Sequence, residues 1–156
     1  MNMSVEKKLY WEDFVPGSRE SMGLVTVDLN EVLEFASRYD PQPFHINQEQ
    51  AKHSIYGGII ASGWHTCAMV MRLMCDSYLL NSTSLGSPGI EGVKWPHPVY
   101  PGDVLTGYRT VIETRPSGSK PDRGIVKTFW EVENQNGELV MSMTGVNFFL
   151  RRKASQ

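Results

Sequence analysis

Hydrophobic residues recur at helical spacing in the first half of this 156-residue chain and alternate with polar residues in much of the second half. Residues 29–39 have one apolar face, and Asp28 followed by Glu31 is a capping-box pattern, so this segment is predicted to be a helix. Before it, residues 21–27 alternate enough to predict a strand. A longer apolar segment, residues 58–80, predicts a buried central helix.

The second half of the chain predicts a run of antiparallel strands. Four strand-like segments occupy residues 90–97, 104–115, 124–133 and 139–150. Turn sequences separate them, among them NQNG at residues 134–137, which is typical of a hairpin. The apolar face of such a sheet must be covered, and the central helix is the available cover. The predicted fold class is therefore α+β, with a curved antiparallel sheet wrapped around one long central helix.

Polar chemistry is concentrated between the two predicted helices. Pro41 and Pro43 disfavour α geometry in the residues before them, so the first helix must end near Asp40 and a stiff loop must follow, with a second short helix beginning near Asn47. Such a loop can hold the Asp40 carboxylate and the His45 imidazole, five positions apart, at a fixed separation. General acid and base catalysis requires this kind of rigidity.

Glycines gather where the central helix is predicted to begin. Gly57, Gly58 and Gly63 allow other backbone or a ligand to approach closely. The first turn of a helix also has unpaired N–H groups that can stabilise an oxyanion. Residues 40–65 therefore offer an acid, a base and oxyanion donors within one short region.

Residues 35–63 resemble the signature of the MaoC-like dehydratases, a family that includes the (R)-specific enoyl-CoA hydratases. The resemblance rests on FASRYDPQPFH at residues 35–45, on Ala51 and on YGGIIASG at residues 56–63, and it extends over nearly the whole chain. Three positions depart from the family's usual pattern: Tyr39 replaces a Gly, Gln42 replaces an Asn and Ser62 replaces a His. The change at Gln42 bears most directly on how the loop is held, and so on the pose of Asp40.

The resemblance implies a hotdog fold and a hydro-lyase that hydrates a trans-2-enoyl thioester, or dehydrates the (R)-3-hydroxyacyl thioester, without a metal or redox cofactor. It assigns catalysis to Asp40, to His45 and to the N–H of Gly63, which holds the thioester oxyanion. Further residues are expected to contact the substrate: Phe44, Tyr56, Gly58, Ser62 and Trp64.

The expected carrier of the acyl group is coenzyme A or acyl carrier protein. If it is coenzyme A, some of the basic residues of the second half should meet its phosphates, because Arg and Lys are the usual phosphate partners. The candidates are Lys94, Arg109, Arg115, Lys120 and Arg123.

Two other functions stay open on the sequence. Many hotdog proteins are thioesterases, commonly with a carboxylate on the central helix, and Asp76 near the far end of the predicted helix is the residue that could serve here. A non-catalytic acyl-thioester-binding or scaffold subunit is favoured if Tyr39, Gln42 and Ser62 distort the site. No spacing typical of metal ligands, phosphate loops or a nucleophilic serine elbow occurs. The remaining histidines are expected to be surface or packing residues: His53, His65 and His97.

Length and composition predict one domain over residues 1–156, with flexible tails at residues 1–8 and 151–156. A formal net charge of −2 and a pI near 6.1 give no reason to expect nucleic acid binding. Because no segment suits a membrane span or a signal peptide, a cytoplasmic protein is expected. Cys67 and Cys75 lie roughly 12 Å apart along the predicted helix, too far for a disulfide. A homodimer is expected, because sheet edges need covering and hotdog relatives pair their sheets.

Overall fold

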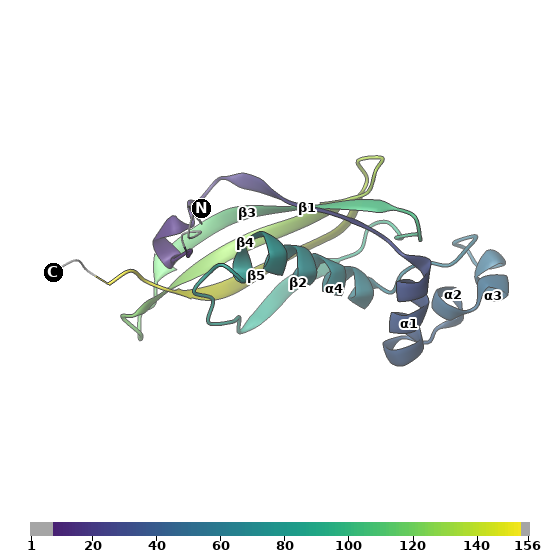
Figure 1. The fold of residues 1–156 in the computed structure, drawn as a ribbon, viewed down its shortest axis with the longest axis horizontal. Helices are drawn as coiled ribbons and strands as arrows, with labels where there is room; N and C mark the ends of the chain where they lie inside the picture. The colour runs from purple at the N-terminus through teal and green to yellow at the C-terminus, as the bar shows by residue number, and fades with distance from the viewer. Residues whose placement is uncertain (1–7, 154–156) are drawn as a thin grey trace, which may run out of the picture.

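The computed structural model describes residues 8–153, and they form one antiparallel sheet with helices on one face and at one end (Figure 1). The strands follow the order β1-β3-β4-β5-β2 across the sheet, so β1 and β2 are its edges. Their bounds are β1 Arg19–Thr26, β2 Gly89–Lys94, β3 Val104–Pro116, β4 Arg123–Glu133 and β5 Leu139–Leu150. The predicted α+β layout is confirmed.

The inner face of the sheet is built by strict alternation along β4. Every second residue of this strand is buried, because successive side chains of a strand point to opposite faces and one face packs on the helix. Trp130 is the largest of these inward residues and is 1% exposed. The predicted NQNG turn joins β4 to β5, with Gly137 at φ +73° and the Asn134 side chain accepting hydrogen bonds from two backbone N–H groups.

The central helix α4, Gly63–Met74, lies across the inner face and continues as a π-helical turn, η2, over Cys75–Leu79 (Figure 1). Its end is fixed to the sheet by a buried hydrogen bond of 3.2 Å, from Trp130 Nε1 to the hydroxyl oxygen of Tyr78. Burial raises the pKa of Tyr78 to about 12, so its hydroxyl stays protonated. The central helix thus runs from Gly63 into the middle of the hydrophobic core.

The central helix begins later than the sequence predicts. Residues 58–61 are not helical: Ile60 N–H donates to Phe44 O and Ala61 N–H donates to Val99 O. Ser62 is the N-cap residue, and its side chain accepts a hydrogen bond from Trp64 N–H. The predicted start at Gly58 is therefore wrong by five residues, because the buried apolar residues before Ser62 belong to an extended segment.

Three further helices form a separate cluster at one end of the sheet (Figure 1): α1 Leu29–Tyr39, α2 Pro43–Ile46 and α3 Gln48–Lys52. The predicted helix over residues 29–39 is confirmed, with Asp28 accepting a hydrogen bond from Glu31 N–H. The predicted stiff loop is partly helical instead, because Pro43 lacks an N–H and has a fixed φ that suits the first position of α2. His45 consequently lies on a helix rather than on a loop.

The strand β2 is shorter than predicted, and the chain ends differ from expectation. β2 stops at Lys94, before Pro96 and Pro98, which cannot donate backbone hydrogen bonds. Of the predicted flexible tails, residues 1–7 and 154–156 lie outside the described residues. Arg152, in contrast, is held in place, because its N–H and guanidinium donate to Glu12 and Asp13. None of the helices among residues 8–153 is both long and apolar enough to cross a membrane.

Candidate active site

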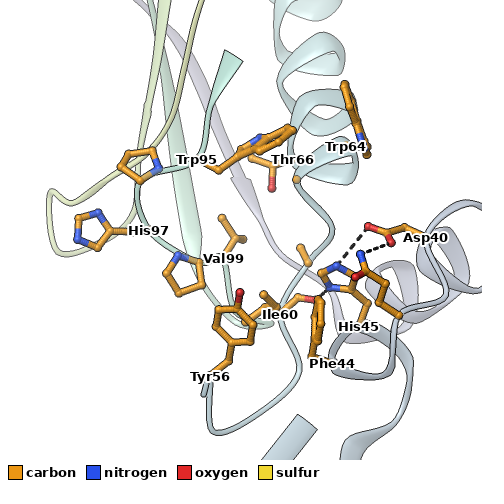
Figure 2. Close-up of a pocket in the computed structure, with 15 residues that line it drawn as sticks. Asp40, Phe44, His45, Tyr56, Ile60, Trp64, Thr66, Trp95, His97 and Val99 are labelled. Atoms are coloured by element: carbon orange, nitrogen blue, oxygen red, sulfur yellow. Dashed lines mark hydrogen bonds and ion pairs between the residues drawn. The ribbon is translucent and has the colours of Figure 1, made fainter. Parts of the chain in front are cut away.

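Asp40 stands at the junction of α1 and α2. It is the C-cap of α1, and its N–H donates to Ala36 O before Pro41 turns the chain away. The turn places the carboxylate over the start of α4 and beside α2 (Figure 2). An acidic side chain from one helix end thereby reaches residues from two other elements.

His45 on α2 faces this carboxylate and is buried, with 4% of its surface exposed. Its Nε2 lies 3.2 Å from Asp40 Oδ2, and its Nδ1 lies 2.7 Å from the carbonyl oxygen of Ile60. A carbonyl oxygen can only accept a hydrogen bond, so Nδ1 carries a proton. Nε2 is therefore the nitrogen that gains or loses a proton, and it is the one next to Asp40.

The Asp40 carboxylate has two further hydrogen-bond donors. Gln42 Nε2 donates to Oδ1 and the Ser62 hydroxyl donates to Oδ2, each over 2.7 Å. Burial alone raises the pKa of Asp40, but the hydrogen bonds from Gln42 and Ser62, together with His45, outweigh it and lower the pKa below its usual value. Asp40 is accordingly a carboxylate at neutral pH and can act as a base.

The first residue of α4, Gly63, contributes the third element of the site. Its N–H belongs to the first turn, where helical N–H groups have no partner within the helix. The indole of Trp95 occupies the space that a side chain would need: a Cβ on Gly63 would lie 2.5 Å from Trp95 Cε2. Glycine is thus required for this close approach, which leaves the backbone of α4 at the cavity surface.

These groups line a cavity of about 430 Å³ (Figure 2). Asp40, His45 and Gly63 form one side of it, and the segment that follows β2 forms the other. Aromatic rings of four residues contribute to the walls: Phe44, Tyr56, Trp64 and Trp95. The volume falls within the range of small-molecule sites, and the mixture of apolar walls with a few polar groups is typical of them.

Comparison with known proteins finds relatives of this chain. A family model described as "MaoC like domain" matches residues 17–134. A crystal structure of a MaoC-like dehydratase from Rhodospirillum rubrum is 40% identical, covers 94% of this chain and 99% of that one, and has a TM-score of 0.86. The 3-hydroxyacyl-thioester dehydratase Z of Mycobacterium tuberculosis is 30% identical over 111 residues, 70% of this chain and 74% of that protein.

The chain belongs to the MaoC-like dehydratase family. This family acts on acyl thioesters. The unliganded R-hydratase PhaJ1 of Pseudomonas aeruginosa, at 17% identity, shares the fold with a TM-score of 0.76 over 96% of this chain and 93% of that one. A double-hotdog protein of Mycobacterium tuberculosis, at 13% identity, also shares it, with a TM-score of 0.83 over 96% of this chain and 46% of that one. The predicted hotdog fold is confirmed.

In this MaoC-like dehydratase, most of the predicted site residues meet at one cavity, and two do not line it. Phe44, Tyr56 and Trp64, which are expected to contact the substrate, line it. Ser62 is fully buried and contacts Asp40 rather than the cavity. Gly58 is also absent from the lining, because the central helix starts five residues later than predicted and the loop before it is extended.

Sequence reasoning missed the far wall of the cavity. Trp95, His97 and Val99 line it together with the two prolines between them. The predicted strand over residues 90–97 includes Trp95, Pro96 and His97, although a proline argues against a strand. The two prolines on either side of His97, directly after Trp95, could have been recognised as a sign of a rigid segment with functional side chains. Thr66, one turn into α4, was also missed, and its hydroxyl lies toward the cavity in Figure 2.

The other histidines differ in their surroundings. His53 pairs with Glu49 on the surface of α3, and His97 lies exposed at the cavity. His65 is buried and stacks on Phe35 at a centroid distance of 4.8 Å. Within residues 8–153, no three His, Cys, Asp or Glu side chains are grouped so that they could hold a metal ion. Cys67 and Cys75 are free, as predicted, but half-buried.

The five basic residues expected at coenzyme A phosphates do not gather at this cavity. Lys94 directly precedes Trp95, but Arg115, Lys120 and Arg123 lie at the β3–β4 hairpin, at the other end of the sheet from α1–α3 (Figure 1). The 13 residues of β3 span roughly 40 Å, so one protomer cannot bring that hairpin to its own cavity. Arg109 is already paired with Glu20 over 2.6 Å.

Proposed function

We propose that this protein hydrates trans-2-enoyl thioesters to (R)-3-hydroxyacyl thioesters and catalyses the reverse dehydration. The observation that carries the proposal is the Asp40–His45 pair, with its two facing atoms 3.2 Å apart, in a cavity that the first residue of α4 also lines. Addition of water to a conjugated thioester needs a base for the water, an acid for carbon and a donor for the oxyanion. The site offers all three.

In the hydration direction, one water molecule binds within hydrogen-bond reach of both the Asp40 carboxylate and His45 Nε2, which are themselves in contact over 3.2 Å. As its oxygen bonds to C3 of the enoyl group, its proton passes to Asp40. The electron pair of the C2–C3 double bond moves toward the thioester carbonyl, and the negative charge develops on the carbonyl oxygen. The N–H of Gly63 donates to that oxygen.

The reaction closes with the protonation of C2. His45, protonated at Nε2, delivers its proton to this carbon. The proton that Asp40 took from water then passes to His45 Nε2, which restores the pair to its starting state. Water thus contributes its hydroxyl to C3, and one proton reaches C2, with no net gain or loss by the protein. The Nδ1–H···O bond to Ile60 keeps the imidazole oriented through both protonation states.

The thioesterase alternative has less support in the geometry. Asp76, the carboxylate of the central helix, lies in η2 and pairs with Arg72 over 3.0 Å on the surface. It does not line the cavity that holds Asp40 and His45. A non-catalytic binding role was favoured if the three departures from the family pattern had distorted the site, but Gln42 and Ser62 both hold Asp40 in place.

Hydration of an enoyl-CoA series, measured by loss of the enoyl absorbance, tests the proposal. The parent protein should hydrate crotonyl-CoA or a longer homologue. Asp40→Asn keeps the shape of the side chain but removes the base, so turnover should fall by roughly 10²- to 10⁴-fold, and His45→Ala should have a similar effect. Because the two groups act on one water, the double variant should be hardly slower than either single variant.

Lys52→Ala, a change on the surface of α3 away from the pair, is the matched control and should hydrate at the parental rate. Melting transitions establish that all variants fold. Folded Asp40→Asn and His45→Ala proteins that keep the parental rate would show that the mechanism is wrong. A parent that binds acyl-CoA of every length but hydrates none would instead have a binding function.

A further inference from the structure

Two of the three departures from the family pattern converge on one carboxylate. Gln42 and Ser62 lie 20 positions apart in the sequence, yet each donates a 2.7 Å hydrogen bond to Asp40. Gln42 donates to Oδ1 and Ser62 donates to Oδ2, so each oxygen of the carboxylate accepts one of these hydrogen bonds. A carboxylate held at both oxygens cannot rotate about its Cβ–Cγ bond without breaking a hydrogen bond.

Ser62 also ties this carboxylate to the start of the central helix. It is fully buried, and its hydroxyl oxygen accepts a hydrogen bond of 3.3 Å from Trp64 N–H. Its carbonyl oxygen accepts from His65 N–H and Thr66 N–H, which are the first intrahelical bonds of α4. Ser62 therefore belongs rigidly to the helical turn that presents the Gly63 N–H, while its hydroxyl hydrogen is directed at Asp40.

We propose that Ser62 and Gln42 are positioning residues that keep Asp40 ionised and oriented between His45 and the N–H of Gly63. The catalytic consequence rests on the function proposed above, whereas the effect on Asp40 itself does not. A conventional N-cap serine would need only its bond to a helix N–H, but here the bond to Asp40 is the shorter of the two by 0.6 Å (2.7 against 3.3 Å). The geometry gives the hydroxyl a second function beyond capping.

The electrostatic surroundings of Asp40 agree with this assignment. Gln42 and Ser62 are neutral donors, and donation to the charged form of a carboxyl group lowers its pKa. Among the titratable groups of the neighbouring elements, His45 on α2 also lowers the pKa of Asp40. Tyr39 on α1 and His65 on α4 both contact the ring of Phe35 instead, Tyr39 in a tilted arrangement and His65 by stacking. Loss of either donor should thus raise the pKa of Asp40.

The test compares two variants with a matched control. Ser62→Ala removes the hydroxyl donor, and Gln42→Glu keeps the shape of an exposed side chain but replaces the donor with a second carboxylate. Asp28→Ala removes the N-cap of α1, far from the cavity, and so weakens a helix start without touching Asp40. The pKa of Asp40 is measured directly by carboxyl-carbon NMR, with Asp40→Asn identifying its resonance.

In Ser62→Ala the pKa of Asp40 should rise by about one pH unit, the equivalent of one lost hydrogen bond to a charged group. It should rise further in Gln42→Glu, because two nearby carboxylates resist ionising together. The acidic limb of the pH profile of kcat/KM should move to higher pH by the same amounts. Asp28→Ala should lower the melting temperature but leave both quantities at the parental values.

Each outcome decides the proposal. An Asp40 pKa that is unchanged in both variants overturns it, and so does an equal displacement of the acidic limb in Asp28→Ala. If Ser62→Ala does not fold, the pKa of Asp40 in Gln42→Glu, a change at an exposed residue, can still be measured by NMR and decides the proposal by itself. A parent without hydratase activity whose Asp40 pKa nevertheless rises in both variants would support the positioning role and refute the proposed reaction.

Discussion

Two buried histidines show how partners, rather than burial, determine the role of a residue in this protein. His45 is 4% exposed and His65 is 6% exposed. His45 has a carbonyl oxygen at one nitrogen and a carboxylate at the other. His65 instead stacks on Phe35, and its Nδ1 has no hydrogen-bond partner among the described residues. The first arrangement suits proton transfer, whereas the second only packs an aromatic ring against its neighbour.

The environment of His65 predicts a pH-dependent stability. Burial lowers the pKa of His65, although Glu31 acts in the opposite direction. The folded pKa then lies below the unfolded value of about 6.5, so the unfolded chain binds more protons as the pH falls. The stability linked to His65 is present above about pH 6.5 and is lost as the pH falls through the lowered folded pKa.

His65→Leu removes this titration while keeping an apolar side chain against Phe35. The difference in melting temperature between the parent and this variant, measured from pH 8 to pH 5, should change in favour of the variant as the pH falls. Parallel curves over that range would contradict the assignment. His53→Leu, a change to an exposed histidine at the C-cap of α3, is the control: its melting temperature should vary with pH as that of the parent does.

At the residue scale, the Asp40–His45 pair could be predicted from the sequence, but the residues that support it could not. Asp40 and His45 are close in the chain, and the prolines between them restrict the backbone, so local pattern suffices. Ser62 and Trp95 reach the site only through the fold, from the start of α4 and from the end of β2. The meaning of Gln42 likewise depends on a side-chain direction that sequence spacing does not encode.

At the scale of elements, the site is the meeting of three ends: the end of α1, the start of α4 and the segment after β2. Length and period identified α1, α4 and β2, but the sequence could not place the start of α4 or the end of β2. Ile59 and Ile60 are buried, as residues of a core helix would be. A short apolar run does not by itself distinguish a helix from an extended segment. The backbone is extended here because Ile60 and Ala61 donate hydrogen bonds to Phe44 and Val99, and both of these partners are remote in sequence.

The contact between Gly63 and Trp95 gives a prediction for two of these elements together. Gly63→Ala places a Cβ less than 3.0 Å from three atoms of the indole, so Trp95 or the start of α4 must move. Trp95 is 41% exposed and can be displaced, so the fold should survive with little change in melting temperature. Turnover should fall by roughly 10- to 10²-fold, because the oxyanion donor is displaced.

A second change distinguishes crowding from a loss of backbone freedom. Trp95→Leu makes room, so turnover of the Gly63→Ala, Trp95→Leu protein should recover relative to the rate of Trp95→Leu alone. Losses that simply multiply in the double variant would show that crowding against the indole is not the cause. Gly118→Ala, where no atom lies within 4 Å of the added Cβ, is the control for a glycine replacement.

At the scale of the whole molecule, β2 is an edge strand with little cover. All but one of its residues are exposed, and large apolar side chains continue from it onto α4. The exposed set comprises Trp64, Met71, Ile90 and Trp95. Met71 lies on the side of α4 that faces β5, because it follows Cys67 by one helical turn and Cys67 contacts Met141 of β5. The strand β5 is the neighbour of β2 in the sheet. A second copy of the chain is the expected cover, because open edges and apolar surfaces favour self-association.

Sedimentation at micromolar concentration should therefore show a homodimer. Met71→Glu, within the exposed set, should shift the protein toward monomer. Leu24→Glu adds the same charge at a 63% exposed position on β1, the opposite edge of the sheet, and should leave the dimer intact. A parent protein that sediments only as a monomer, or a Leu24→Glu variant that dissociates as readily as Met71→Glu, would count against this interface.

The paired indoles at the cavity have an optical consequence. The chain has four tryptophans; Trp130 is buried in the core, and Trp11 packs on Gly124 and donates to Ile125 O. Trp64 and Trp95 have ring centroids 5.3 Å apart and ring planes at 78°, and both line the cavity and are solvent-exposed. An acyl thioester that enters should displace water from these two rings, quenching their emission or moving it to shorter wavelength. The signal should disappear in the Trp64→Phe, Trp95→Phe protein and persist in Trp11→Phe, so occupancy of the site can be followed in the unlabelled protein whatever reaction it catalyses.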